Sequence, residues 1–517
     1  MSFSKKYIFS FLILALLIIS PSVYADDDLL KIGLYWGNSA KTDYSVSASS
    51  NLSVGYYSEK NFVAAISTNE NYATICPDSS YHILYKQGIT LGEAAELASN
   101  LCKKGISAFI RFSNGTYSVA ADSFSTENDC AWAAENLAEK GTVLAIQPTD
   151  TVVKDKSGKI IFMSDTNCGI VSQNEKITLK ASAEKEYRGG LTFYQSNSKL
   201  VAANIVNTEK YLYSVISKEM SPSWNKEALK AQAICARCFA YNNKNKHKKD
   251  GFELCDTVCC QAYAGTSSET KNSYAPVDET KGQYLLYNGK VCETFYCSSM
   301  GPTTENVKYV WGSEYPYLVS VDNSYEDYEN VYNGKWQNTL TKQRATEIMQ
   351  AKNYNVGDVT EIKALEYSPS GRVIKLLVKG TAGEKTFEKD SCRNIFSEVT
   401  PSQYYTISGG GEETVPVISV KSGENGETVK ISLKNKKIIS SNGTYSSGET
   451  VYATNGTQKT PYTITKSQSS SYTFSGFGWG HGVGMSQYGA KAMADAGIDY
   501  KNILIHYFPG TQVGKPN

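Results

Sequence analysis

The sequence predicts an α+β protein in which one long mixed module is interrupted twice. Three observations lead to this prediction. Strand-like and helix-like segments alternate over residues 170–400, strand–helix–strand units repeat within residues 81–150, and a stretch rich in Gly, Ser, Thr and Asn covers residues 408–470. The length of 517 residues fits two to four domains, and a composition with 41% hydrophobic and 20% charged residues is that of a folded chain.

The charge balance and the cysteine count exclude two classes of function. The chain has 52 Lys and Arg against 51 Asp and Glu, and no basic run, so we do not expect a nucleic-acid partner. Four His accompany 12 Cys. A metal site rich in imidazole is therefore excluded, whereas one rich in thiolate is not.

Residues 1–25 have the pattern of a signal peptide. Lys5 and Lys6 precede an apolar run from Ile8 to Ile19, and Val23 and Ala25 are small residues at the −3 and −1 positions of a cleavage site. The alternative is an uncleaved N-terminal anchor, although the run is shorter than the roughly 20 residues that span a bilayer. We therefore expect the protein to act outside the cytoplasmic membrane.

Residues 26–75 are expected to form an N-terminal β segment, with strands at 31–36, 51–57 and 61–68. The repeat follows within residues 76–165, where Ala98–Gly105 matches Ala134–Gly141. Gly105 and Gly141 are expected to end the two helices in a left-handed conformation. Two such units resemble the SPOR domain, which binds peptidoglycan strands stripped of their stem peptides. The alternative is a structural insertion without a ligand.

The strongest helix is predicted over residues 224–241, with Ser221-Pro222-Ser223 as its start signal. It follows the segment Tyr211–Met220, which ends in Glu219 and Met220. A partly buried acid at such a position can remain protonated and serve as a general acid. An exposed acid at a helix end is the alternative.

These two segments together resemble the stage II sporulation protein D and LytB amidase-enhancer family. The resemblance implies that Glu219 is the catalytic acid of a peptidoglycan lytic transglycosylase and that Arg237 binds substrate or organises the site. It also implies a catalytic core at residues 166–408, a β-rich insertion at 409–470 and a C-terminal part of the core at 471–517.

The Gly-rich segment Phe474–Ala490 resembles the C-terminal signature of the same family. Trp479 offers an apolar face to a sugar ring, and His481 and Gln487 offer polar groups. The resemblance implies that these three residues line the substrate cleft. The alternative is that His481 and Gln487 only satisfy buried backbone groups.

A third segment, Phe295–Asn306, is similar to another family motif, with Cys297 in place of the usual His. Cys297 lacks a recognisable activating base, which argues against a nucleophilic role. Four other side chains of the segment are predicted to bind sugar: Tyr296, Ser298, Ser299 and Thr303.

Four soft or borderline metal ligands lie within 14 residues: His247, Cys255, Cys259 and Cys260. This set suits a closed, structural zinc site. Some members of the family resemble this stretch and bind zinc there through Cys and His. Vicinal Cys259 and Cys260 make a poor disulfide pair. Disulfides with other cysteines and free thiols remain the alternatives.

The first hypothesis for function is cleavage of the MurNAc–GlcNAc backbone of denuded peptidoglycan strands, with Glu219 as acid and then base. Hydrolysis would need a second acid, for which Glu209, Glu227 and Glu305 are candidates. The second hypothesis is a non-catalytic, wall-binding amidase enhancer. A zinc hydrolase is disfavoured, because three thiolates are typical of structural zinc. The expected partners are glycan strands and a membrane or cell-wall protein.

Overall fold

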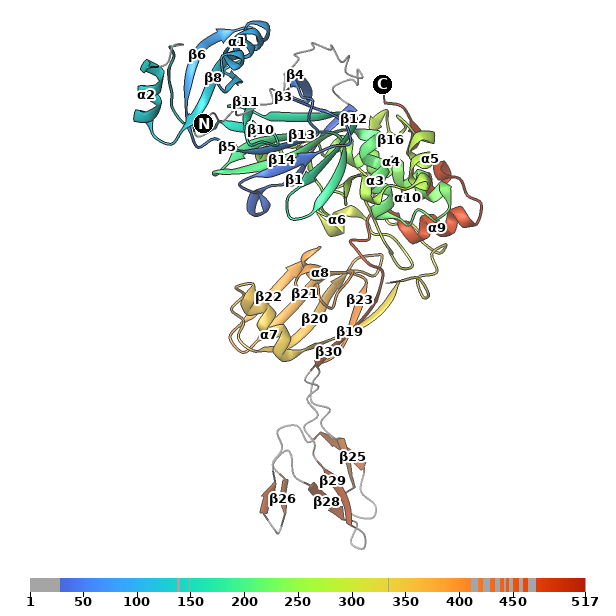
Figure 1. Ribbon diagram of the computed structural model, residues 1–517. Helices are drawn as coiled ribbons and strands as arrows, with labels where there is room; N and C mark the ends of the chain where they lie inside the picture. The colour runs from blue at the N-terminus through green and yellow to red at the C-terminus, as the bar shows by residue number, and fades with distance from the viewer. Residues whose placement is uncertain are drawn as a thin grey trace, which may run out of the picture. The chain divides into compact units, whose positions relative to one another are not determined.

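The computed structural model describes residues 28–516, except 137–139, 148, 333 and the links between strands within residues 411–470. The chain forms two compact units. The first contains the described residues up to 294 together with 499–501 and 511–516, and the second contains residues 295–498 and 502–510 (Figure 1). The predicted signal segment, residues 1–25, lies outside the described residues. Among the described residues, no helix combines the length and apolarity that a membrane span requires.

A large, mostly antiparallel sheet of 15 strands dominates the first unit. The alternation of apolar side chains explains strand β1, in which Leu30, Ile32 and Leu34 are buried. Thirteen strands follow the order β15 (Leu254–Cys255), β1 (Leu29–Tyr35), β14 (Lys199–Asn207), β13 (Glu184–Ser196), β12 (Cys168–Lys180), β2 (Tyr44–Ser47), β5 (Tyr72–Pro77), β10 (Thr151–Lys154), β11 (Ile160–Ser164), β7 (Ala108–Ser113), β8 (Thr116–Phe124), β6 (Tyr81–Ile89) and β9 (Thr142–Leu144). The remaining strands are β3 (Leu52–Ser58), which pairs with β12, and β4 (Asn61–Ser67), which pairs with β3.

The repeat region runs strand, helix, strand twice, from β6 to β9, with α1 (Leu91–Lys103) and α2 (Glu127–Asn136) as its helices. Its sheet is not separate, because β7 pairs in parallel with β11 and so joins the large sheet. Gly105 has the expected left-handed φ of 87° after α1. Gly141 does not have a left-handed φ. Glycine is required at this position because a Cβ would lie 2.5 Å from the Ile83 side chain.

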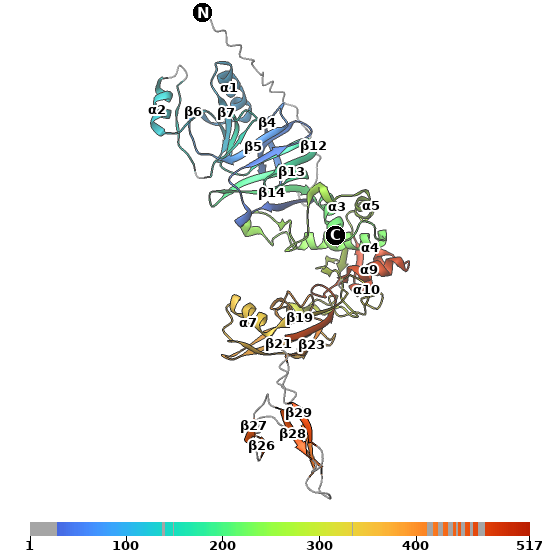
Figure 2. The ribbon, with the colours of Figure 1, turned by 60° about the horizontal axis from the view of Figure 1, so that its bottom comes forward.

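Three helices pack on one another beside β14 in the first unit (Figures 1 and 2). They are α3 (Thr208–Glu219), α4 (Lys226–Asn242) and α5 (Lys271–Glu279). The N-cap of α4 is Asn225, whose side chain accepts a hydrogen bond from the Glu227 amide at 3.0 Å. The expected start signal at residues 221–223 instead lies in the turn between α3 and α4. Smaller elements complete this unit: η2 (Gly37–Ser39), η3 (Lys248–Asp250), η4 (Gly265–Ser268), β16 (Tyr284–Tyr287), β17 (Lys290–Val291) and β32 (Gln512–Gly514).

The second unit has its own hydrophobic core between two three-stranded sheets and α7 (Lys342–Ala351). Met349, Phe396 and Phe474 are completely buried in it. The sheets are β19 (Lys335–Thr341), β30 (Ser471–Phe477) and β23 (Tyr405–Gly409), and β20 (Val359–Tyr367), β21 (Val373–Gly380) and β22 (Glu384–Glu388). The other elements are β18 (Tyr296–Cys297), α6 (Val307–Val310), α8 (Ser391–Asn394), β31 (Met485–Ser486), α9 (Gln487–Asp495) and α10 (Tyr500–Tyr507), of which the first two residues of α10 belong to the first unit. The predicted core of residues 166–408 is thus divided after residue 294, because this second core forms separately.

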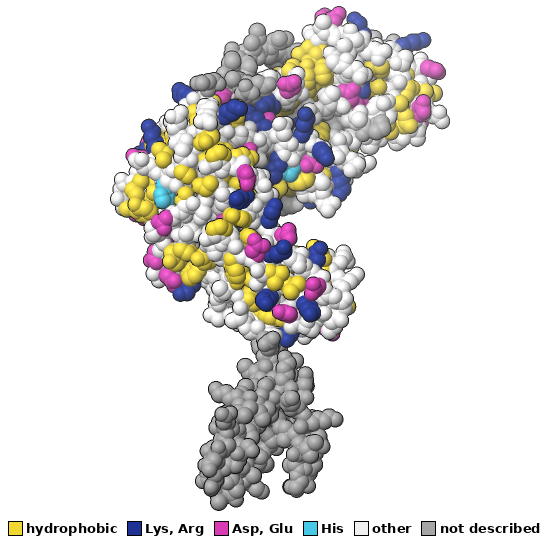
Figure 3. All heavy atoms as spheres, turned by 180° about the vertical axis from the view of Figure 1, so that it is seen from behind, with side chains coloured by type: hydrophobic (Ala, Val, Ile, Leu, Met, Phe, Trp, Pro, Cys, Tyr) yellow, Lys and Arg dark blue, Asp and Glu magenta, His cyan; other side chains and the backbone are white. Residues whose placement is uncertain are grey.

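The Gly-rich stretch contains three antiparallel hairpins, as its β patterns predict. Their strands are β24 (Val417–Lys421), β25 (Thr428–Ser432), β26 (Ile438–Ser440), β27 (Gly443–Tyr445), β28 (Thr450–Thr454) and β29 (Lys459–Thr463). The architecture as a whole agrees with the predicted α+β class. On the face in Figure 3, acidic and basic side chains are interspersed, which matches the balanced charge of the sequence.

Candidate active site and metal centre

Glu219 is the last residue of α3. The helix begins where the Asn207 side chain accepts a hydrogen bond from the Glu209 amide at 3.0 Å, and it buries Tyr211, Leu212, Val215 and Ile216 along one face. Met220 turns into extended backbone and is buried, which ends the helix and leaves Glu219 half-buried. The helix therefore fixes the direction in which this carboxyl group points.

The Glu219 carboxylate accepts a hydrogen bond from the Ala262 amide at 3.1 Å. The preceding residue, Gln261, is 1% exposed and bonded at both ends of its side chain. Its Oε1 accepts from the Tyr211 hydroxyl at 3.2 Å, and its Nε2 donates to the Ala236 carbonyl at 3.4 Å. A rigidly held backbone amide thus contacts the acid that the sequence singled out.

Arg237 on α4 is completely buried. Its guanidinium makes two bonds to the Glu209 carboxylate, at 2.6 and 2.9 Å, and a third to the Gln283 carbonyl at 3.1 Å. Because these groups surround the guanidinium, Arg237 cannot reach a sugar in this structure. Of the two roles predicted for Arg237, its surroundings favour organisation of the site, and direct binding of substrate is not supported.

The three candidate second acids are all engaged in structural contacts. Glu209 is bound by Arg237 and also accepts from the Gly282 amide at 3.3 Å. Glu227 forms an ion pair with Lys230 at 2.9 Å and accepts from the Tyr500 amide at 3.0 Å. Glu305 is 1% exposed and accepts hydrogen bonds from Ser370 at 2.7 Å and from the Asn306 amide at 2.7 Å.

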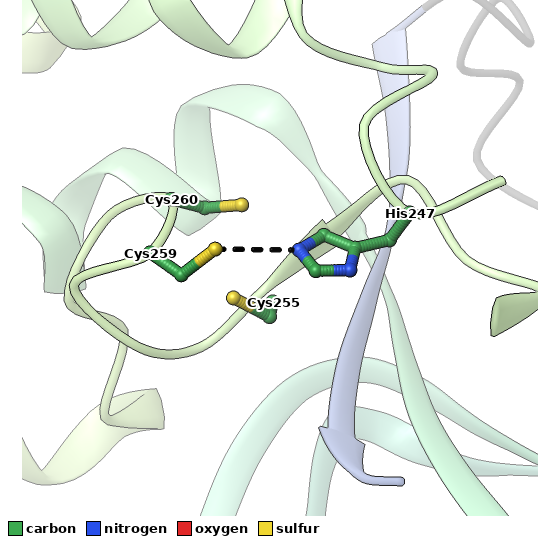
Figure 4. Close-up of side chains that lie close together, drawn as sticks. All are labelled: His247, Cys255, Cys259 and Cys260. Atoms are coloured by element: carbon green, nitrogen blue, oxygen red, sulfur yellow. Dashed lines mark hydrogen bonds between the residues drawn. The ribbon is translucent and has the colours of Figure 1, made fainter. Parts of the chain in front are cut away.

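The four residues of the predicted metal site come together in the first unit (Figure 4). Their ligand atoms all lie within 4.8 Å of one another, and His247 Nε2 lies 3.8 Å from the Cys259 sulfur. Zn–S bonds of about 2.3 Å and Zn–N bonds of about 2.0 Å place tetrahedral ligand atoms roughly 3.5–3.8 Å apart. The arrangement therefore fits a tetrahedral metal after a small contraction.

Two further observations on this cluster suit a metal. Asp250 Oδ2 lies 3.0 Å from His247 Nδ1, which leaves the Nε2 lone pair directed at the thiols. A hydrogen bond from the Cys260 thiol lowers the pKa of Cys255 and thereby favours its thiolate. All twelve cysteines fall within the described residues, and each is a free thiol.

In the second unit, the Gly-rich segment lies against the segment that contains Tyr296. Strands β18 and β31 pair in parallel, with Tyr296 opposite Met485, and the Trp479 amide donates to the Ser299 carbonyl at 2.8 Å. Gly480 and Gly484 have φ of 122° and 80°, and a Cβ on Gly484 would lie 2.2 Å from the Phe295 carbonyl oxygen. Glycine is required here because two backbone segments approach each other closely.

His481 has both ring nitrogens committed to the backbone. Nδ1 accepts from the Val483 amide at 3.0 Å, and Nε2 donates to the Tyr296 carbonyl at 3.1 Å, which fixes the neutral Nε2–H tautomer. Burial, assisted by the charge of Arg393, lowers the pKa of His481 to about 4. The structure therefore agrees with the alternative to a cleft-lining role for His481: the ring satisfies backbone groups and holds the two segments together.

Comparison with known proteins places this arrangement in a family. The family model described as stage II sporulation protein (SpoIID) matches residues 196–287, which contain Glu219, Arg237 and the cysteine cluster. Residues 196–287 of this chain therefore form a SpoIID segment. A second model, described as a domain of unknown function (DUF8618), matches residues 314–423 of the second unit. The SPOR-like identity of the repeat region stays a prediction.

Three relatives show the extent of the likeness. The chain is 32% identical over 317 residues to a protein named amidase enhancer from Bacillus subtilis (strain 168), a match that covers 58% of this chain and 40% of that protein. It is 29% identical over 322 residues to stage II sporulation protein D of the same organism, covering 59% of this chain and 74% of that protein. An uncharacterised protein of Brachyspira hyodysenteriae (strain ATCC 49526 / WA1) is 29% identical over 329 residues, and the match covers 63% of this chain and 72% of that protein.

The sugar-binding residues predicted from the SpoIID motifs all lie in the second unit, apart from Arg237. Ser299 is 1% exposed and its hydroxyl donates to the buried Glu326, so it is not available to a sugar. Gln487 is 6% exposed, with an Nε2 that has no hydrogen-bond partner among the described residues. The more accessible members of the set are Tyr296, Ser298, Thr303 and Trp479, of which Trp479 is 47% exposed.

Sequence reasoning did not assign a site role to Trp311, or to the buried residues Arg372 and Glu326. Trp311 is 40% exposed and its ring lies 5.0 Å from that of His481, beside the Gly-rich segment. Arg372 donates to the carbonyls of Met300 and Thr303, both at 2.6 Å, and so fixes the backbone next to the SpoIID motif. Its own sequence surroundings carry no motif that would have revealed it. The Cys297 thiol has its pKa raised to about 11 by burial, which agrees with the rejection of a nucleophilic role.

Proposed function

We propose that this protein is a peptidoglycan lytic transglycosylase that uses Glu219 as its acid and base. The observation that carries the proposal is the placement of Glu219, half-buried at the end of α3 and in contact with the Ala262 amide. The contact with the Ala262 amide holds the carboxyl group in one position, which suits a group that must transfer a proton to and from a bound sugar.

In the proposed reaction Glu219 donates its proton to the glycosidic oxygen as that oxygen leaves C1 of N-acetylmuramic acid. The resulting carboxylate then removes the proton from the 6-hydroxyl of the same sugar, whose oxygen bonds to C1. The products are a 1,6-anhydro end and a free 4-hydroxyl on the leaving sugar. No water is consumed, and Glu219 returns to its starting protonation state.

A single acid is enough for this route, whereas a hydrolase of the usual kind needs a second carboxylate in the site. The structural contacts of the three candidate second acids would have to break before any of them could serve this role: Glu209, Glu227 and Glu305. This supports transglycosylation over hydrolysis. Trp479 and Trp311, with exposed aromatic faces in the second unit, are the residues that we propose contact sugar rings.

We further propose that His247, Cys255, Cys259 and Cys260 hold one structural zinc ion. Three thiolates and an imidazole leave no open coordination position, so the ion would supply folding energy rather than chemistry. The loop that follows Cys260 carries the Ala262 amide to Glu219. The metal site would thereby stabilise the loop that positions the acid. We place the protein at the cell wall or the outer face of the membrane, where glycan strands and a wall or membrane protein are its partners.

The second candidate function is that of a non-catalytic amidase enhancer, which one relative's name supports. In that case Glu219 would be structural. The chain matches only 40% of that relative, so the name carries over to part of the protein at most.

The deciding experiment digests purified glycan strands that lack stem peptides with the wild-type chain, Glu219→Gln and Glu184→Gln, and analyses the products by mass. Glu184 is an exposed acid paired with Lys180, and its replacement is the matched control. We expect 1,6-anhydro ends from the wild type and from Glu184→Gln, and no cleavage by Glu219→Gln. Reducing ends would indicate hydrolysis, and binding without cleavage by the wild type would favour the enhancer.

The metal proposal is tested by elemental analysis of the wild type, Cys255→Ala and Cys102→Ala. Cys102 is a half-buried thiol outside the cluster. We expect one zinc ion per chain in the wild type and the control, and loss of the metal in Cys255→Ala. A Co²⁺-substituted wild type should also show sulfur-to-metal charge-transfer absorption, and a wild type without metal or such absorption would contradict the proposal.

A further inference from the structure

A basic surface adjoins the cysteine cluster of the first unit and has no part in the roles assigned above. The eight residues 243–250, which follow α4, include four lysines that do not form one continuous run. We refer to these four residues as the lysine patch: Lys244, Lys246, Lys248 and Lys249. The last three are exposed, and Lys244 is half-buried.

Backbone hydrogen bonds hold the segment that carries the lysine patch in one conformation. The Lys246 amide donates to the Asn243 carbonyl at 3.0 Å, and the Lys248 amide donates to the Asn245 carbonyl at 3.3 Å. The segment ends at Phe252, which is 3% exposed. Because this segment is already ordered, a partner that binds it has little further backbone entropy to remove.

The positive charge of the lysine patch is only partly offset within its own segment. Within the described part of the chain, no carboxylate forms an ion pair with Lys248 or Lys249. Asp250 is the one acid of the segment, and its carboxylate lies 3.0 Å from His247 Nδ1. The exposed ammonium groups at this surface are therefore available to an anionic partner.

Acids on neighbouring elements do not reverse the sign of the patch. Glu293 is half-buried and accepts a hydrogen bond from Asn243. Asp256 interacts with Lys185, which lies outside the patch. A zinc ion held by three thiolates would carry one net negative charge. The four lysines still exceed the sum of Asp250, Glu293 and such a cluster, in a chain whose total charge is only +1.

Apolar side chains stand out from the same surface. Val258 is 91% exposed on the turn that leads into Cys259 (Figure 4), and Tyr241 is 47% exposed near the end of α4. Lys246 links the two places, because its ammonium group contacts the Cys259 carbonyl and lies 5.6 Å from the Phe239 ring of α4. Exposed apolar side chains beside ammonium groups are typical of a surface that lies in a membrane interface.

We propose that the lysine patch, with Val258 and Tyr241, docks the first unit on a membrane surface that contains anionic lipids. The lysines face the lipid phosphates, and the two apolar side chains enter the boundary between headgroups and acyl chains. An anionic polymer in solution offers phosphates but no apolar boundary, so the exposure of Val258 favours the membrane.

The inference rests on the proposed placement at the outer face of the membrane, and it is independent of the reaction at Glu219. Docking of this kind would keep the protein at the membrane after cleavage of the predicted signal segment. It assigns a partner to a surface that the catalytic proposal leaves unused.

The test measures co-sedimentation of residues 26–517, which include every described residue, with vesicles of phosphatidylcholine alone or mixed with phosphatidylglycerol. The variants are Lys248→Gln/Lys249→Gln and Val258→Ser. The matched control is Lys103→Gln/Lys104→Gln, which changes the charge equally at two adjacent exposed lysines at the end of α1. Amide hydrogen exchange over residues 241–263 establishes that each variant keeps the segment folded.

We expect the wild type to bind only the vesicles that contain phosphatidylglycerol. Each lysine near an anionic surface contributes about fivefold, so the patch variant should bind roughly 25-fold more weakly. Val258→Ser should bind about threefold more weakly, because it removes an apolar contact. The control should bind as the wild type does.

Equal binding to neutral vesicles, no binding to either kind, or an equal loss in the control would overturn the proposal. A soluble poly(glycerol phosphate) that binds the wild type as tightly as the vesicles, and Val258→Ser equally well, would assign the patch to a wall polymer instead. Glycan cleavage is measured without vesicles on the same preparations. A chain that docks but does not cleave would refute the proposed function alone, and a chain that cleaves but does not dock would refute the docking alone.

Discussion

Replacement of Arg237 by Met tests whether this residue supports the fold or touches the substrate. The guanidinium is completely buried, while the Glu209 carboxylate that it holds at 2.6 Å has only 14% of its side chain exposed. Met retains much of the aliphatic volume but leaves Glu209 charged and unpaired inside the protein. Breaking a buried ion pair in this way costs about 3–5 kcal/mol of unfolding free energy. Because water can partly reach Glu209, we expect about 3 kcal/mol.

The matched control is Arg344→Met in the second unit. Arg344 also makes a two-bond contact with a carboxylate, that of Glu398, but the two side chains are 51% and 41% exposed. Exposed pairs of this kind contribute about 0–1 kcal/mol. The comparison therefore separates the effect of burial from the effect of pairing.

The assay is urea unfolding read by hydrogen exchange of peptides from α3 and α4, because a chain of two units need not unfold in one transition. The expected result is a lower midpoint at unchanged slope. In the double variant Glu209→Gln/Arg237→Met no charge is left buried, and we expect it to regain about 1–3 kcal/mol relative to Arg237→Met. A loss in Arg237→Met no larger than in Arg344→Met, accompanied by weaker glycan binding, would refute the structural role and restore substrate contact.

Two further predictions concern the second unit. In the unfolded chain His481 takes up a proton near pH 6.5, whereas in the folded protein it does so near pH 4. The protein should therefore lose roughly 3 kcal/mol of stability as the pH falls from 6.5 to 4. Below pH 4 this residue should cause no further loss of stability. The stability difference between wild type and His481→Gln should shrink by that amount over this range, and a constant difference would contradict the argument. Gly484→Ala should destabilise by more than about 2 kcal/mol because its Cβ would overlap the Phe295 carbonyl. Gly497→Ala, with a similar φ of 87° but nothing within 4 Å, should lose only about 1 kcal/mol, and equal losses in thermal denaturation would show that backbone strain alone matters.

The local sequence determined the features that depend on near neighbours. The periodicity of residues 224–241 predicted a helix close to α4, and the alternation of apolar residues placed β1, β3 and β4 within one or two residues. The spacing of His247 and the three cysteines predicted a cluster that does form. These features could be predicted from the sequence because a helix turn, a β-strand or a short ligand loop depends on side chains only a few positions apart.

The tertiary structure alone decided which of the predicted polar groups remain available. Ser299 is committed to Glu326, 27 residues away, and Arg237 to Glu209, 28 residues away. The contact between Ala262 and Glu219 spans 43 residues. A motif shows which donors and acceptors are present, but whether each is satisfied depends on partners that only the folded chain brings within hydrogen-bond distance. For this protein, the sequence singled out Glu219 and the cluster of His247 with three cysteines, and the fold showed which neighbouring residues contact them.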